Sequence, residues 1–114
     1  MGHREYQRTD RVGAQLRREI GQLVHQDVRD QHVPEVSVSD VEVTRDLSLA
    51  KVFVTALDPA TAKEAVALLN EAAKGYRQAL SKLLSLRQVP ELRFHYDDSV
   101  DRGERIDALL RDVR

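Results

Sequence analysis

The 114-residue sequence has no cysteine and no tryptophan, and it has only two phenylalanines and three tyrosines. Without cysteine the chain can form neither a disulfide nor a thiolate metal site, which fits a reducing cytosol. Because aromatic residues are so few, the hydrophobic core must consist mainly of Val, Leu, Ile and Ala. We therefore expect a small globular domain with an aliphatic core.

Long apolar segments are also missing. The longest uninterrupted apolar run, Ala65 to Leu69, is far shorter than the ~20 residues that span a bilayer. The N-terminus lacks the apolar region of a secretory signal. We therefore expect a cytoplasmic protein without a membrane segment, in which residues 1–114 form a single domain.

The common sequence signatures of enzymes are absent as well. There is no P-loop, no GxGxxG, no HExxH and no serine-nucleophile motif. The densest polar cluster is His95-Tyr96-Asp97-Asp98. We interpret His95 as a solvent-facing strand residue and the aspartates as a turn and helix cap, not as an acid–base or metal site. We expect no enzymatic activity, no cofactor and no metal.

The most informative stretch is a long helical pattern that begins after Asp58-Pro59, an N-cap acid followed by a proline at the first helical position. Apolar residues then recur at steps of three and four to form one face: Ala62, Val66, Leu69, Ala73, Tyr76, Leu80 and Leu83. One straight helix from Ala60 to Leu86 would be ~40 Å long, against a domain diameter of ~30 Å. We therefore expect two helices that meet in a sharp bend at Ala73-Lys74-Gly75, with Gly75 ending the first.

Positive charge gathers around this bend. Residues 74–93 contain one acid, Glu91, and five bases: Lys74, Arg77, Lys82, Arg87 and Arg93. The segment therefore carries a net +4, although the whole chain carries −1. A helix N-terminus beside basic residues favours phosphate binding. The alternative, which these residues leave open, is a solvated basic helix face with a tolerated glycine.

The remaining pattern predicts one more helix before this stretch and strands on both sides of it. A helix is expected from Thr9 or Asp10 to about Val28, and Arg4, Arg8 and Arg11 share one side if that helix extends further back.

Strands are expected over 36–43, over 50–56 and over 92–96. The valine alternation slips near Ser39-Asp40, which predicts a β-bulge. The first two strands form an antiparallel hairpin, and Phe53, on its polar face, is expected to cover the sheet edge or the bulge. A last helix is expected after Asp98 or Ser99. The resulting α-β-β-α-α-β-α order predicts an α+β fold with a three-stranded mixed sheet.

Several of these segments resemble ribosome-binding factor A, a family of small bacterial factors. The likeness covers nearly the whole chain and is most specific in four runs: Arg8-Thr9-Asp10-Arg11-Val12, Val41-Glu42-Val43-Thr44-Arg45-Asp46-Leu47, Ala50-Lys51-Val52-Phe53-Val54 and Phe94-His95-Tyr96-Asp97-Asp98-Ser99. The resemblance implies a KH-like fold of α-β-β-α-α-β order, with a short C-terminal helix added. It implies that an Ala-x-Gly bend, here Ala73-Lys74-Gly75, replaces the nucleic-acid clamp loop of KH modules.

The resemblance also implies a function without catalysis. A member of this family binds free or immature small ribosomal subunits through 16S rRNA and assists late maturation and 5′-end processing, including cold adaptation. The expected partners are the small subunit and other assembly factors, and the free protein is expected to be a monomer. The expected RNA-binding residues are Ala73, Lys74, Gly75, Arg77, Lys82, Arg87, Arg4, Arg8 and Arg11.

Two features depart from the family pattern. Asp30-Gln31-His32 stands where relatives usually have Asp-Pro-Arg, and the sequence ends at Arg114 without the long charged tail of some relatives. Contacts that depend on that arginine or on a tail are therefore not carried over. The competing hypothesis is a protein-interaction module whose acidic residues, including Asp40, Glu42 and Asp46, bind a basic partner.

Overall fold

The computed structural model describes residues 2–84 and 88–97, with side chains from Thr9 onward. Its elements are α1 (Gly2–Arg29), β1 (Val36–Val43), β2 (Leu49–Ala56), a 3₁₀ turn η1 (Pro59–Thr61), α2 (Ala62–Leu83) and β3 (Glu91–Tyr96). The predicted α+β class and the positions of the three strands are confirmed. The predicted C-terminal helix lies outside the described residues.

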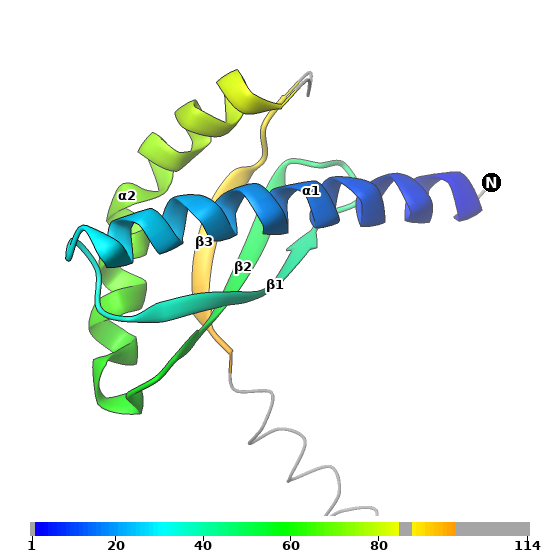
Figure 1. The fold of residues 1–114 in the computed structure, drawn as a ribbon. Coiled ribbons are helices and arrows are strands. Elements are labelled where there is room, and N and C mark those ends of the chain that lie inside the picture. Colours follow the sequence, from blue (N-terminus) through cyan, green and yellow to red (C-terminus); the bar gives the residue numbers. More distant parts are fainter. Residues whose placement is uncertain (1, 85–87, 98–114) are drawn as a thin grey trace, which may run out of the picture.

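The three strands form a mixed sheet in the order β1-β2-β3 (Figure 1). β1 and β2 pair antiparallel, and β2 and β3 pair parallel. The register shifts between Val38 and Asp40, so the bulge predicted from the slipped valine pattern is confirmed. The extra residue of the bulge shifts the in–out alternation of side chains by one position. Val36 and Val41, which lie on either side of the bulge, therefore both face the core. Phe53 is half-buried and pairs with Asp40, next to the bulge, as expected.

Both helices pack on one face of the sheet. Along β2, Ala50, Val52 and Val54 are buried, whereas Lys51 and Thr55, which alternate with them, are exposed. The helices cover the buried face with Val12, Leu16, Ile20 and Val24 of α1 and Ala65, Leu69, Tyr76 and Leu80 of α2. Period-2 burial in the strands and helical burial in α1 and α2 are the patterns on which the sequence prediction rested.

Helix α1 is longer than predicted, because it begins at Gly2 and not near Thr9. It therefore places Arg4, Arg8 and Arg11 within one continuous helix, which is the condition for them to share a side. At the other end, Gln31 adopts a left-handed conformation with φ of 64°. The His32 N–H donates to the Asp27 carbonyl at 2.9 Å, which closes the helix in the usual C-terminal manner.

The predicted break at Gly75 is wrong. α2 is one helix from Ala62 to Leu83, and no described glycine has positive φ. The ribbon of α2 changes direction about halfway along its length, so a kink is present without an end to the helix (Figure 1). The physical reason is that a glycine inside a helix costs only about 1 kcal/mol, less than the burial of Tyr76 and Leu80 beyond it contributes.

We therefore expect Gly75→Ala to raise the free energy of unfolding by about 0.5–1 kcal/mol, since alanine is the better helix former. A β-carbon at Gly75 would meet no heavy atom within 4 Å. Gly21, in α1, is equally open and provides a matched control. Urea melts of both variants measure the effect. A loss of stability in Gly75→Ala, with a gain in Gly21→Ala, would show that Gly75 is strained after all.

Candidate functional site

A depression of about 420 Å³ lies between the middle of α2 and the outer strand β3. It is lined by Asn70, Ala73, Lys74, Arg77, Glu91, Leu92 and Arg93. The four α2 residues recur at helical steps of three and four, so one side of the helix presents them together. We call this depression the α2/β3 groove.

The α2/β3 groove is predominantly positive. Lys74, Arg77 and Arg93 bring three positive charges, and Glu91 brings one negative charge. The Arg93 Nε lies 3.8 Å from a Glu91 carboxylate oxygen, and both side chains are more than half exposed, so this ion pair is weak. The Arg77 Nε donates to the Val89 carbonyl at 2.9 Å, which ties α2 to the segment before β3. The groove is therefore suited to an anionic ligand.

One wall of the groove is the β3 edge opposite β2, here called the free edge because no strand pairs with it among residues 2–84 and 88–97. Asn70 bonds both peptide groups of Phe94 there: its Nδ2 donates to the Phe94 carbonyl at 3.1 Å, and its Oδ1 accepts from the Phe94 N–H at 2.8 Å. Peptide groups alternate in direction along a strand, and those of Glu91 and Asp97 point toward β2. The N–H and C=O of Leu92 therefore face the free edge, next to Lys74 and Arg77.

Tyr76 is a buried residue of α2 that holds the helix in place beside the groove. Its ring is buried and packs edge-on against Phe94, with ring centroids 5.9 Å apart. Its hydroxyl donates to an Asp27 carboxylate oxygen, and the other Asp27 oxygen lies 3.2 Å from His32 Nδ1. Burial, and then the neighbouring Asp27 carboxylate, raise the pKa of Tyr76 well above its ordinary value. This hydrogen bond holds α2 against the C-terminal end of α1. Tyr76, which forms it, is the residue after Gly75.

This contact predicts a difference between the wild type and Tyr76→Phe at high pH. Because folding raises the pKa of Tyr76, the stabilisation is complete below the ordinary tyrosine pKa of 10.0 and declines as the pH rises above that value. Tyr76→Phe should lose about 1–3 kcal/mol at neutral pH, since Asp27 loses its donor. It should then decline less steeply than the wild type above pH 10.0. Urea melts across the pH range test this, and parallel curves would contradict it.

The structure brings together only some of the residues predicted for binding. Ala73, Lys74 and Arg77 line the groove, and Gly75 is exposed beside them. Lys82 is exposed in the last turn of α2 and does not line the groove.

The other predicted binding residues lie elsewhere. Arg11 is exposed on α1, and Arg4 and Arg8 lie in α1 before the residues whose side chains are described. Arg87 lies outside the described residues. Sequence reasoning missed Asn70 and Leu92, because neither carries a charge and only their position at the β3 edge marks them.

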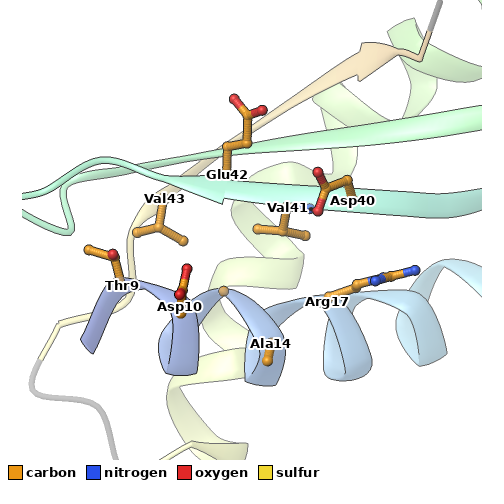
Figure 2. Close-up of a pocket in the computed structure, with 9 residues that line it drawn as sticks. Thr9, Asp10, Ala14, Arg17, Asp40, Val41, Glu42 and Val43 are labelled. Carbon is orange, nitrogen blue, oxygen red and sulfur yellow. Dashed lines mark hydrogen bonds between the residues drawn. The ribbon is translucent and has the colours of Figure 1, made fainter. Parts of the chain in front are cut away.

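A second depression, of about 470 Å³, lies between α1 and β1. Figure 2 shows Val41 and Val43 directed toward α1 and Glu42 directed away from it. Three of its lining residues are acidic, Asp10, Asp40 and Glu42, and one is basic, Arg17. Because Glu42 is directed away from α1 (Figure 2), the charges between α1 and β1 are those of Asp10, Asp40 and Arg17, a net of −1, whereas the α2/β3 groove has a net of +2.

Other kinds of site have little support among the described residues. Asp27, Asp30 and His32 hold possible ligand atoms within 4.8 Å of one another, but exposed acidic groups commonly gather in this way without a metal. In the part of the chain that the structure describes, neither helix has an apolar stretch that could cross a bilayer.

Comparisons with known proteins agree with the resemblance noted in the sequence. The family model described as ribosome-binding factor A matches residues 8–110. The ribosome-binding factor A of Stenotrophomonas maltophilia (strain K279a) is 62% identical over 108 residues, which cover 95% of this chain and 85% of that protein.

Solved structures share the fold. The crystal structure of ribosome-binding factor A from Thermus thermophilus has a TM-score of 0.68 at 25% identity, covering 77% of this chain and 94% of that one. A homology model of the protein from the same species, fitted into a cryo-EM map of a complex of the 30S subunit and ribosome-binding factor A, has a TM-score of 0.55 at 20% identity, covering 71% and 90%. With the family model spanning most of the sequence, the chain belongs to the ribosome-binding factor A family.

Proposed function

We propose that this protein binds the RNA of the small ribosomal subunit through the α2/β3 groove. The observation that carries the proposal is the joining of three positive side chains and a free strand edge in one groove. Phosphates need positive side chains, and an unpaired base needs donors and acceptors. The groove offers both.

The proposed contacts divide between the two walls. Lys74 and Arg77 hold the phosphate backbone, and Gly75, which has open space around it, lets that backbone approach the helix closely. The Leu92 N–H and C=O, at the free edge of β3, pair with the edge of an unpaired base. Ala73 has a small side chain, so it leaves room for the RNA strand between α2 and β3. Lys82 adds charge in the last turn of α2, Arg87 adds a further positive charge, and Arg4, Arg8 and Arg11 add contacts on α1.

In the cell, this binding serves assembly of the small subunit. The family name and the fold neighbour fitted into a 30S complex support a ribosomal partner. We infer that the protein binds 16S rRNA on free or immature small subunits in the cytoplasm. There it assists late maturation and 5′-end processing, including at low temperature. As a single domain that is monomeric when free, it acts by binding and not by catalysis, alongside other assembly factors.

Co-sedimentation tests this function. The purified protein is centrifuged separately with free small subunits, free large subunits and whole ribosomes. Preferential recovery with free small subunits is the expected result. Equal recovery with small subunits and whole ribosomes, or recovery with large subunits alone, would disprove the assembly role.

The acidic depression between α1 and β1 favours a second candidate, the binding of a basic protein segment. Protein-free 16S rRNA distinguishes the two. If the protein binds RNA, log affinity should fall with log salt with a slope of about −0.7 to −0.9 per neutralised phosphate. Binding to intact subunits, but not to this RNA, would support the basic partner.

A further inference from the structure

The outward face of α1 is basic and amide-rich along its described length. It comprises Arg11, Gln15, Arg18, Gln22, His25 and Arg29, all of them exposed. These positions recur at steps of four and three, opposite the core residues Val12, Leu16, Ile20 and Val24. Arg4 and Arg8 continue the same spacing toward Gly2, where α1 begins. We call Arg11 to Arg29 at this spacing the α1 stripe.

No acidic residue interrupts the α1 stripe. The acids of α1 from Thr9 onward lie off it: Asp10 lines the depression against β1, Glu19 is half-buried, and Asp27 bonds Tyr76. Among the residues whose side chains are described, no carboxylate forms a salt bridge with Arg11, Arg18 or Arg29. These three guanidinium groups are therefore available to an external anion.

The chemistry of the stripe narrows the class of ligand. The apolar side of α1 is buried against the sheet, so the helix has no apolar face to insert into a membrane. The backbone groups of α1 are bonded within the helix, so the stripe, unlike the β3 edge, offers no free peptide groups to pair with an unpaired base. What remains is a row of donors that suits phosphates and hydroxyls.

The shape of the stripe indicates a rigid ligand. Figure 1 shows α1 as one straight helix. From Arg11 to Arg29 the stripe is ~27 Å long, with the Arg11, Arg18 and His25 positions ~10.5 Å apart. Positions seven apart drift by only ~20° around the helix, so they stay on one side. Two rigid surfaces bind without the entropy cost of ordering a flexible strand.

We propose that the α1 stripe is a second RNA-binding surface and that it takes the backbone of double-stranded RNA. Duplex RNA is a rigid rod whose shallow minor groove exposes phosphates and 2′-hydroxyls, which arginine and glutamine side chains can bind. The surface is separate from the α2/β3 groove, which suits an unpaired strand. Only the choice of RNA over DNA rests on the proposed function.

Two adjacent arginines provide the test. Arg17 and Arg18 are both exposed, but Arg18 lies on the stripe and Arg17 lines the depression against β1. The probe is a labelled, blunt RNA duplex of about 16 base pairs, the length that double-stranded-RNA domains span. One of its strands alone is the comparison. Fluorescence anisotropy gives the affinities of wild type, Arg18→Glu and Arg17→Glu across a salt series.

Arg18→Glu is expected to weaken duplex binding about tenfold and to reduce the salt slope by about one. Arg17→Glu should change duplex affinity less than about twofold, although it alters net charge equally. Arg18→Glu should also leave single-strand affinity nearly unchanged. Circular dichroism checks the fold, and Arg18→Gln, which removes the charge without reversing it, should give a smaller loss in the same direction.

Equal losses in Arg17→Glu and Arg18→Glu would overturn the proposal, because only net charge would matter. Unchanged duplex binding in Arg18→Glu, or equal losses for duplex and single strand, would overturn it as well. The assay contains no ribosome, so its outcome is independent of co-sedimentation. Lys74→Glu should retain duplex binding, which separates the stripe from the groove.

Discussion

Replacing both Lys74 and Arg77 by glutamate is expected to weaken binding to free small ribosomal subunits by on the order of a hundredfold. The two side chains enter the α2/β3 groove from one side of α2, and the change replaces two positive charges with two negative ones. The remaining groove charges, Glu91 and Arg93, roughly cancel. Quantitative co-sedimentation at fixed salt gives the affinity.

Matched variants distinguish an effect of the groove from an effect of the protein's net charge. Lys51 is exposed on the face of β2 opposite the helices. Lys51→Glu should therefore bind nearly as well as the wild type, whereas Lys74→Glu should bind clearly worse. Lys82→Glu should have an intermediate effect, because Lys82 lies outside the groove. Arg77→Glu also removes the bond to Val89, so urea melts must show that the double variant is folded. A folded double variant with wild-type affinity would place the RNA contact elsewhere.

Phe94→Ala is expected to lower the free energy of unfolding by about 3–5 kcal/mol. Phe94 is the largest fully buried side chain in the described part of the chain, at 2% exposure, and its ring packs edge-on against Tyr76. Natural domains are stable by only about 5–15 kcal/mol, so this loss should bring the protein close to unfolding at growth temperature.

Phe94→Leu provides the control, because it keeps much of the buried volume and should cost distinctly less than the alanine variant. In urea melts the free energy of unfolding should decrease from wild type to Phe94→Leu to Phe94→Ala. If the protein remains folded, weakened RNA binding in Phe94→Ala is also expected, since the Phe94 ring packs against Tyr76 beside the groove. The two bonds to Asn70 use the Phe94 backbone and should persist. A loss below about 1 kcal/mol would show that the core refills the space.

Local pattern predicted the elements and most of their faces, although Leu83, the last position of the predicted α2 face, is exposed. Alternating valines with one slip predicted β1 and its bulge between Val38 and Asp40, and the periodic positions Leu69, Tyr76 and Leu80 proved to be buried. These features depend on residues close together in sequence, because a side chain's face follows from its place in a helix or strand. The same runs of residues also identified the family.

Length and glycine were poorer guides than periodicity. The helical phase continued through Gly75, and the structure follows that phase with an unbroken helix, while the left-handed residues of the described chain are Gln31 and Leu47. A lone glycine lowers helix stability by about 1 kcal/mol, whereas packing on both sides of it contributes more. The burial of apolar side chains in the tertiary structure therefore outweighed the local helix-breaking preference of glycine.

The sequence alone was sufficient for the family, the α+β class, the strand positions and the basic character of residues 74–93. The α2/β3 groove required the folded chain. Parallel pairing of β3 with β2 leaves the other β3 edge free, and α2 packs beside that edge, so Asn70 and Leu92 meet Lys74 and Arg77. Sequence spacing reports which face of an element a residue occupies. Which faces of distant elements meet depends on the packing of the whole core.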